Sequence, residues 1–280
     1  MKSRKNILVM PIVKWVGGKR QLLNELIPLL PKKISTYCEP FVGGGALFFN
    51  QQPKSAYIND INKELIELYE TVRDDVEYLI TILKDFKNEP DFFYSIRDWD
   101  RNNKEYLLRS KVERAARIVY LNKTCYNGLF RVNNAGEFNT PFGYYKNPNI
   151  VNAPVLKAVN LYFNNADIKF THMNYLEVCE SLPRESFVYL DPPYDPISDT
   201  SNFTGYSKGG FNKEEQTKLK ECCDTLNKRK IKFMLSNSAT TFIQELYSEY
   251  NITIIQAKRA INSVSTKRGD VNEVVVRNYE

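Results

Sequence analysis

The chain has 280 residues, of which 42% are hydrophobic and 26% charged, and its formal net charge is +6. This composition is typical of a globular protein, and the length suits one large domain or a core domain with a sizeable insertion. No apolar run approaches the roughly 18 residues of a transmembrane helix. The basic N-terminal stretch is interrupted by Pro11 and Lys14 and lacks the cleavage site of a signal peptide, so we expect a cytoplasmic protein.

Cysteine and histidine usage argues against metal and disulfide chemistry. The five cysteines include no CxxC pair, so neither a zinc site nor a disulfide framework is expected. The one histidine, His172, excludes a histidine pair or a multi-histidine metal site. We expect it in a structural or surface position beside a strand end.

The positive charge is concentrated in two segments. Residues 101–150 hold nine Lys or Arg and three acidic residues, and residues 1–20 hold six basic and no acidic ones. Clustered positive charge favours a polyanionic partner such as a nucleic acid, although a solvated helix face would have the same pattern. The charge distribution alone leaves both interpretations open.

Hydrophobic patterns predict alternating strands and helices at the start of the chain. ISTYCEPFVGGGALFFN (34–50) predicts a strand, a glycine loop and a helix, and SAYINDINKELIELYETV (55–72) predicts a strand, an acidic turn and a helix. Residues 76–118 have apolar side chains at helical spacings of three and four. Residues 123–150 place Gly, Asn and Pro between aromatic residues, which predicts loops with a hairpin.

The alternation returns from residue 167. Strands are predicted at DIKFTHM, FVYLDPPY, KFMLSNS, ITIIQAKRA and EVVVRNY, with helices around 213–229 and 240–249. Strands that alternate with helices favour a mostly parallel sheet, so the predicted fold class is α/β. Residues 76–160 break the alternation and are predicted to be an inserted second domain.

The segment EPFVGGGALFF places three glycines between a strand and a helix. Glycine lets the backbone turn sharply and approach a ligand closely. Asp60 follows the next strand, where nucleotide-binding α/β folds carry an acid that binds ribose hydroxyls. The spacing matches neither GxGxxG nor a Walker sequence, so a plain tight turn is the alternative for the loop taken alone.

The stretch VYLDPPYDP (188–196) runs from an apolar strand into a carboxylate, two prolines and an aromatic ring that we expect to be exposed. The exocyclic amine of a nucleobase is a poor nucleophile because its lone pair is delocalised into the ring. The Asp191 carboxylate and the Pro192 carbonyl can accept its two hydrogens, since prolines hold the backbone in place. Tyr194 offers a face on which a flat base can stack. A structural turn at a strand end is the competing interpretation.

Several long strings, in order, resemble the Dam family of DNA adenine-N6 methyltransferases, especially the DpnM-type enzymes of restriction–modification systems. The strings are PIVKWVGGKRQLL, EPFVGGGALFF, INDIN, YNGLFRVN with GEFNTPFGYYKNP, VYLDPPYDPIS and SNFTGYSKGGFN. The resemblance implies a Rossmann-like class I methyltransferase sheet with helices on both faces. It implies a catalytic domain of residues 1–72 and 161–280, and an inserted target-recognition domain of helices and a hairpin at 73–160.

The resemblance also implies that S-adenosyl-L-methionine is the cofactor and that an adenine flips out of duplex DNA to be methylated. The catalytic residues would be Asp191, Pro192, Pro193 and Tyr194. The donor site would comprise Trp15, Gly17, Gly18, Lys19, Pro40, Phe41, Gly43, Gly45, Asp60, Ile61, Asn174, Tyr175 and Asp191. Asn174 stands where many members of the family have Asp, and its amide would bind the donor's adenine ring.

Matching the family's recognition hairpin residue by residue implies the DNA contacts. Tyr126 would wedge into the base stack, and Asn127 would lie near the gap left by the flipped base. Arg131 would bind a guanine, whose O6 and N7 match its planar fork, and GATC is the expected site. The expected DNA-binding residues are Lys14, Tyr126, Asn127, Leu129, Arg131, Asn133, Asn139 and Pro141. Residues 199–212 are expected to order on DNA binding and close over the target base.

The expected partner is double-stranded DNA, bound by a monomer, and a restriction endonuclease encoded nearby is a functional partner that needs no stable complex. Asp191 disfavours amide methyltransferases, which carry Asn before the prolines, and cytosine-N4 enzymes, which carry Ser. The chain has no Pro-Cys dipeptide, which argues against cytosine-C5 chemistry. An RNA adenine methyltransferase and a DNA-binding subunit without catalysis stay open as alternatives.

Overall fold

The computed structural model of the protein describes residues 5–197, 211–258 and 270–280. The chain divides into two compact units. The first unit comprises Met1–Gly18, Gly43–Lys54 and Asp60–His172, and the second comprises Lys19–Val42, Ser55–Asn59 and Met173–Glu280. The predicted division assigns donor binding to residues 1–72 and 161–280 and DNA binding to residues 73–160. The compact units do not test this assignment, so it stays a prediction.

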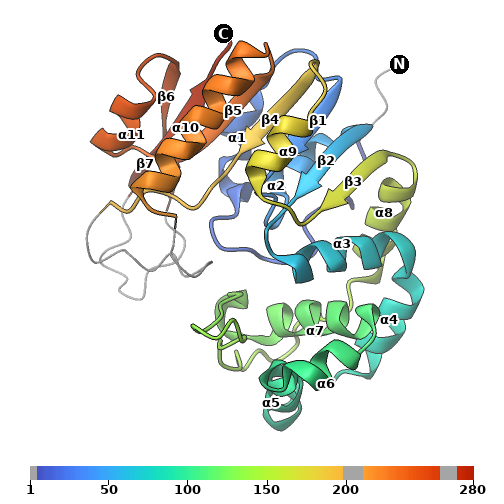
Figure 1. Cartoon of the computed structure of the whole chain (residues 1–280). Helices are drawn as coiled ribbons and strands as arrows, with labels where there is room; N and C mark the ends of the chain where they lie inside the picture. Colours follow the sequence, from blue (N-terminus) through green and yellow to red (C-terminus); the bar gives the residue numbers. More distant parts are fainter. Residues whose placement is uncertain (1–4, 198–210, 259–269) are drawn as a thin grey trace. The chain divides into compact units, whose positions relative to one another are not determined.

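The second unit contains a mixed sheet in the order β2-β1-β4-β5-β7-β6 (Figure 1). Its strands are β1 (Thr36–Glu39), β2 (Ser55–Asn59), β4 (Ser186–Leu190), β5 (Lys232–Ser238), β6 (Asn251–Lys258) and β7 (Asp270–Arg277). The neighbours among β2, β1, β4 and β5 are parallel, whereas β7 is antiparallel to both β5 and β6. The predicted α/β fold is therefore confirmed, with an antiparallel pair at one edge.

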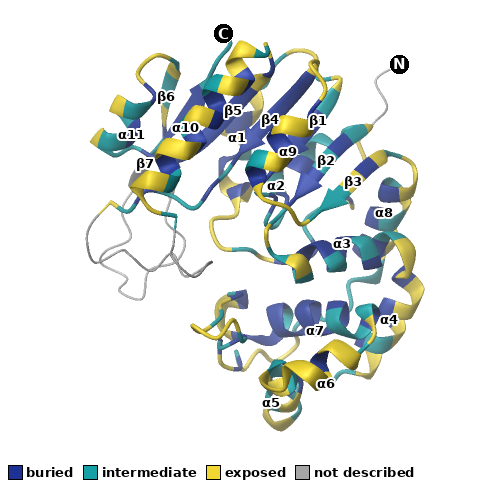
Figure 2. Ribbon diagram, in the orientation of Figure 1, coloured by how far each residue is buried: buried dark blue, intermediate teal, exposed yellow. Residues whose placement is uncertain are grey.

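Helices cover both faces of this sheet. They are η1 (Lys19–Leu22), α1 (Leu23–Leu26), η2 (Ile27–Leu29), α9 (Tyr175–Ser181), α10 (Lys213–Lys228) and α11 (Thr241–Leu246). Val188 of β4 belongs to an apolar core shared with α9, α10 and α11. On the opposite face Phe187 contacts Tyr279, whose hydroxyl donates to the Leu29 carbonyl of η2 (3.0 Å). Since alternate strand residues point to opposite faces, β4 is buried along its whole length (Figure 2).

The first unit is mostly helical. It contains α2 (Ala46–Gln51), α3 (Lys63–Asp74), α4 (Val76–Asp85), α5 (Pro90–Arg97), η3 (Asp98–Arg101), α6 (Asn103–Leu108), α7 (Lys111–Thr124), η4 (Tyr126–Gly128), α8 (Ala153–Asn164) and the strand β3 (Asp167–Thr171). The predicted helical region is divided because Pro90 begins α5 and Ser110 caps α7 with a capping box to Glu113. The alternation of strand, loop and helix predicted from residue 34 to residue 72 is confirmed.

The predicted hairpin within residues 123–150 is also present. Antiparallel bridges join Cys125 to Phe142 and Val132 to Phe138. At its tip the Asn133 Oδ1 accepts hydrogen bonds from two backbone N–H groups, those of residues 135 and 137, both at 3.0 Å. Gly136 adopts a φ of 86°, which glycine tolerates best. The tip is therefore held by its own side chain–backbone bonds.

Candidate active site

Asp191 follows directly on β4, at the carboxyl end of a central strand of the second unit. Its Oδ1 lies 2.8 Å from the Nζ of Lys19, a buried residue of η1. Burial raises the pKa of Asp191 to about 6. The Lys19 ammonium opposes this rise, and the Glu273 carboxylate adds to it. At neutral pH the carboxyl group is thus ionised and able to accept a hydrogen bond.

Buried amide side chains hold the backbone of Pro193 and Asp195 in the loop that follows β4. Gln216 of α10 donates from Nε2 to the Pro193 carbonyl (3.0 Å) and accepts at Oε1 from the Asn237 Nδ2 of β5 (3.0 Å). The Asn237 Oδ1 accepts in turn from the backbone N–H of Asp195 (3.0 Å). Because buried polar groups are costly unless paired, this network favours a single conformation of the loop after β4.

The second acid of the DPPYD string has a supporting role that the sequence analysis missed. Asp195 is buried, and its Oδ2 accepts from the Thr240 hydroxyl (2.7 Å) while its carbonyl accepts from the Ser238 hydroxyl (2.7 Å). Both partners follow or end β5, more than 40 positions along the chain. The available signal was the polar run SNSAT at the end of the apolar strand KFML.

Tyr194 is not the exposed ring that we expected. Its side chain is half-buried, and its hydroxyl donates to the Glu273 Oε2 at 2.7 Å. The Lys19 Nζ lies 4.5 Å from the centroid of its ring. The expectation of exposure was wrong because β7, which carries Glu273, pairs beside β5 and presents an acceptor to the hydroxyl.

The second unit holds part of the predicted donor set: Lys19, Pro40, Phe41, Asn174, Tyr175 and Asp191. The rings of Phe41 and Tyr175 have centroids 5.0 Å apart, and Phe211 lies 6.0 Å from Phe41, so three aromatic residues form a cluster. Asn174 is exposed and caps α9, with its Oδ1 accepting from the Leu176 N–H at 2.9 Å. Phe211, which lies at the end of SNFTGYSKGGF, was not among the predicted site residues.

The first unit holds the rest of that set: Trp15, Gly17, Gly18, Gly43, Gly45, Asp60 and Ile61. The two oxygens of Asp60 accept from the N–H groups of Gly43 and Asn62, each at 2.9 Å. Burial raises the pKa of Asp60, and these two hydrogen bonds oppose the rise. Ile61 next to it is 66% exposed. The site therefore combines a fixed carboxyl group with an exposed apolar side chain.

Trp15 joins the glycine loop to the hairpin inside the first unit. Gly43 has a φ of 48°, and a Cβ on it would lie 2.8 Å from the Trp15 Cδ1. The indole also stacks on Phe130, with ring centroids 4.6 Å apart and planes at 20°. Glycine is thus required at position 43 by a packing partner as well as by the turn.

The structure places the predicted DNA-binding residues in the first unit. Lys14, Tyr126, Asn127, Arg131, Asn133 and Pro141 are exposed, and Leu129 and Asn139 are half-buried. The Arg131 Nε donates to the Asn139 Oδ1 at 2.7 Å, so Asn139 orients the guanidinium. Asn127 has a φ of 58°, in the left-handed region that Asn tolerates. The Asn133 side chain is engaged in the hairpin tip described above.

The buried Asn122 of α7 brings Lys14 beside the start of the hairpin. Its Oδ1 accepts from the Lys14 N–H (2.8 Å), and its Nδ2 donates to the carbonyls of Lys14 (2.8 Å) and Gly128 (3.1 Å). A single amide therefore pairs with the backbone of two segments that are more than 100 positions apart. Lys14 was predicted as a DNA contact from the resemblance, whereas Asn122, which holds its backbone, was not predicted.

Two charged side chains fix the backbone of Phe138, on the far strand of the hairpin. The Phe138 N–H donates to the Asp100 Oδ2 (2.7 Å), and the Arg101 Nη2 donates to the Phe138 carbonyl (2.6 Å). Asp100 is itself held by the buried Arg117, whose Nη2 lies 2.6 Å from the same Oδ2. We call Asp100, Arg101 and Arg117 the hairpin clamp.

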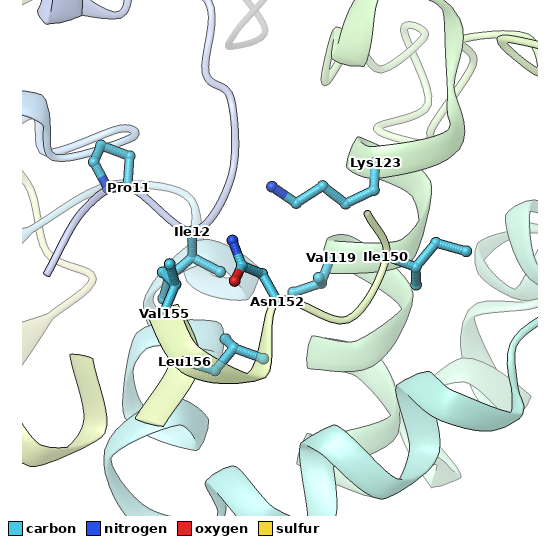
Figure 3. Close-up of a pocket in the computed structure, with 8 residues that line it drawn as sticks. All are labelled: Pro11, Ile12, Val119, Lys123, Ile150, Asn152, Val155 and Leu156. Atoms are coloured by element: carbon cyan, nitrogen blue, oxygen red, sulfur yellow. The ribbon is translucent and has the colours of Figure 1, made fainter. Parts of the chain in front are cut away.

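The first unit also contains a small pocket between α7 and α8 (Figure 3). It is lined by Pro11, Ile12, Val119, Lys123, Ile150, Asn152, Val155 and Leu156. Its volume of about 20 Å³ accommodates roughly one water molecule. The pocket is too small for a nucleoside, and we assign it no ligand.

The part of the chain that the structure describes contains neither a candidate metal site nor a candidate membrane-spanning helix. Among those residues no group of three or more His, Cys, Asp or Glu side chains could hold a metal ion. None of the described helices is long and apolar enough to cross a membrane. His172 is exposed and directly follows β3, as expected.

Comparison with known proteins bears on the whole chain. A family model for D12 class N6 adenine-specific DNA methyltransferases matches residues 15–261. The chain is 41% identical over 279 residues to the Type II methyltransferase M1.LlaDCHI of Lactococcus lactis subsp. cremoris, with 99% of this chain and 98% of that protein covered.

Two further relatives come from other organisms. The Type II methyltransferase M.MjaIII of Methanocaldococcus jannaschii is 42% identical over 291 residues, covering 97% of this chain and 99% of that protein. The DNA adenine methylase of Escherichia coli K12 is 34% identical over 271 residues, covering 94% and 93%. These similarities extend over both units of the chain.

Proposed function

The chain belongs to the D12 class of N6 adenine-specific DNA methyltransferases, and we propose that it transfers the methyl group of S-adenosylmethionine to adenine N6 within GATC. The observation that carries the chemistry is the Asp191–Lys19 pair at the end of β4. The family disfavours the two alternatives left open by the sequence, an RNA methyltransferase and a binding subunit without catalysis.

The loop after β4 supplies two acceptors for the two hydrogens of the adenine amine, the Asp191 carboxylate and the Pro192 carbonyl. Lys19 contacts Oδ1 of Asp191, so we assign Oδ2 to the N6 hydrogen. Hydrogen bonds to both hydrogens draw the nitrogen lone pair out of conjugation and toward the methyl donor. The ionised Asp191 is also the nearest acceptor for the proton that N6 loses after transfer.

The residues of the two donor sets suit a nucleoside bearing a sulfonium. S-Adenosylmethionine, when bound, supplies an electrophilic methyl group. Asp60 suits the ribose hydroxyls because its oxygens are fixed at a strand end, and the exposed Ile61 beside it offers an apolar surface for the adenine ring. The Phe41, Tyr175 and Phe211 cluster offers further aromatic surface.

The hairpin supports the recognition of duplex DNA. Tyr126 is 58% exposed next to Asn127, as a side chain that enters a base stack must be. Asn139 holds the Nε of Arg131, so the terminal guanidinium nitrogens are the ones we assign to guanine O6 and N7. Guanine recognition by Arg131 is consistent with GATC, which the resemblance of the hairpin implies.

We further propose a monomer that acts in the cytoplasm on double-stranded DNA, with a restriction endonuclease as a functional partner. Residues 1–72 and 161–280 would bind the donor, and residues 73–160 the DNA. The closure of residues 199–212 over the target base falls largely outside the described residues, which resume at residue 211.

The test is incubation with S-adenosylmethionine and duplex oligonucleotides that contain GATC or a scrambled site. The DNA is digested and N6-methyladenine is quantified by mass spectrometry. Asp191→Asn serves as the control because it keeps the shape of the side chain and removes its charge. An RNA duplex that contains the corresponding sequence GAUC is included to test the RNA alternative.

N6-Methyladenine in the GATC duplex alone, lost in Asp191→Asn, is the expected result. Methylation of both DNA duplexes would retain the chemistry and reject the assignment of GATC. Methylation of the RNA duplex alone would overturn the choice of substrate. Donor binding without any methylated base would favour a binding subunit.

A further inference from the structure

The hydroxyl of Tyr194 is bound by a carboxylate from a different part of the sheet. Glu273 lies on β7, where it pairs with Ser238 of β5 and Ile255 of β6. Its Oε2 accepts from the Tyr194 hydroxyl at 2.7 Å. Neighbouring Val274 and Val276 face the apolar core on the other side of the sheet, so the alternation of β7 directs Glu273 toward the face that carries Tyr194.

A half-buried carboxylate in a strand needs a compensating partner. Glu has low strand propensity, and burying its charge costs free energy unless it is paired. Here the partner is a hydroxyl of the catalytic loop. The same ring is also next to a cation, because the Lys19 ammonium lies 2.8 Å from the Asp191 Oδ1 and 4.5 Å from the centroid of the Tyr194 ring.

We propose that Glu273 is a positioning residue of the active site, which fixes the plane of the Tyr194 ring for stacking with the target adenine. This inference rests on the proposed function, since it gives the ring a base to stack on. Tyr194 has two rotatable side-chain bonds, and a hydrogen bond at the hydroxyl restrains the end of the ring farthest from the backbone. Prolines restrain the near end.

The charge of Glu273 also reaches Asp191. The groups that surround Asp191 are Lys19 of η1, Glu273 of β7, Tyr194 of its own loop and Tyr189 of β4. Burial raises the pKa of Asp191. Lys19 and Tyr194 lower that pKa, whereas Glu273 raises it. Removal of the negative charge of Glu273 should therefore lower the pKa of Asp191.

The experiment combines three variants, Glu273→Ala, Tyr194→Phe and the double variant, in single-turnover methylation of the GATC duplex. Each single variant should slow methyl transfer about 10- to 100-fold, with donor affinity changed less than about twofold. The double variant should be no slower than the slower single variant, because both changes remove the same hydrogen bond. Glu249→Gln, an exposed glutamate of the same unit bound to Lys220, is the control and should react like the wild type.

A second readout does not depend on activity. The carboxyl carbon of Asp191, identified with Asp191→Asn, is titrated by NMR in the wild type and in Glu273→Gln. The apparent pKa should fall in Glu273→Gln. The role of Glu273 would be overturned if the rate losses of the two single variants multiplied in the double variant. An unchanged pKa of Asp191 in Glu273→Gln would overturn it as well. If the titration shifts but the wild type methylates no adenine, the proposed function fails instead.

Discussion

At the residue scale, folding and the catalytic role that we propose for Asp191 place conflicting demands on its carboxyl group. The carboxyl group must be ionised to accept an amine hydrogen, yet burial raises its pKa to about 6. Lys19 opposes that rise from 2.8 Å. Under the proposed mechanism the buried cation supports the acid, because a protonated Asp191 offers a hydrogen where an acceptor is needed.

The pH dependence of the reaction should follow from this pair. Methylation should decline as the pH falls through about 6, since Asp191 becomes protonated there. In Lys19→Met the ammonium that lowers the pKa is absent, so activity should be lost at a higher pH than in the wild type. Single-turnover rates from about pH 5 to about pH 8 measure this shift. A decline at lower pH in Lys19→Met would contradict the assignment of the pair.

The glycine loop permits a matched comparison. Gly43 and Gly136 both have positive φ, at 48° and 86°, but a Cβ on Gly136 meets no atom within 4 Å while one on Gly43 meets Trp15. Both substitutions to Ala should cost roughly 1–2 kcal/mol of backbone strain, and Gly43→Ala should cost about 1–3 kcal/mol more through the clash with the indole.

Urea unfolding measures both stabilities, and titration with the donor measures binding. Gly43→Ala should also weaken donor binding, because the Gly43 N–H donates a hydrogen bond to Asp60. Strain in the loop would therefore shift the carboxyl group that we assign to the ribose. Equal losses of stability in the two variants would show that the contact with Trp15 is easily relieved.

At the scale of elements, the groups that we propose for catalysis gather where strands end. The loop after β4 carries Asp191, and polar residues at the end of β5 support it through Asn237 and Ser238. Carboxyl ends of neighbouring parallel strands meet at one edge of a sheet, which is why ligands bind there in open α/β folds. In the first unit, α7 plays the comparable role for the hairpin through Asn122 and Arg117.

The hairpin clamp should influence sequence specificity rather than chemistry. Asp100→Asn weakens the bond to the buried Arg117 and to the Phe138 N–H, so the strand that carries Asn139 should shift relative to Arg131. We expect discrimination between GATC and a site with the guanine replaced to fall about tenfold. The ratio of kcat/KM values for the two duplexes measures it.

Glu105→Gln is the control for this prediction, because Glu105 is an exposed acidic residue of α6 in the same unit. Its specificity should equal that of the wild type. Asp100→Asn should retain single-turnover methylation of GATC once duplex is saturating. A loss of rate on GATC with unchanged discrimination would assign the clamp to overall stability alone.

At the scale of the whole molecule, the excess of positive charge suits a polyanionic substrate. Residues 101–150 carry nine basic and three acidic side chains, although several of these form ion pairs within the first unit, among them Arg114 with Glu67. Such pairs do not contribute free charge to DNA binding. The net charge therefore overstates the number of phosphates that the protein can contact.

DNA binding should weaken steeply with salt. The logarithm of the association constant should fall linearly with the logarithm of the salt concentration, with a slope of about −0.9 for each phosphate neutralised. Fluorescence anisotropy with a labelled duplex measures it, and donor binding, which neutralises no phosphate, serves as the internal control. A slope near zero would contradict a DNA-binding surface based on charge.

The sequence by itself determined the order of strands and helices, the hairpin within residues 123–150, and the position of Asp191 after a buried strand. These features depend on local signals, because periodicity and turn residues act within a few positions. The family could also be predicted from the sequence, since its motifs are contiguous strings in a fixed order.

Only the tertiary structure decided which side chains act together. Lys19 contacts Asp191, Glu273 binds Tyr194, and the hairpin clamp holds Phe138, all across long separations in the chain. Such pairs depend on strand order and helix packing, which are set by the burial of the whole core rather than by local propensity. For the same reason Tyr194 was expected to be exposed and is half-buried, because the strand that covers its hydroxyl lies 79 positions away.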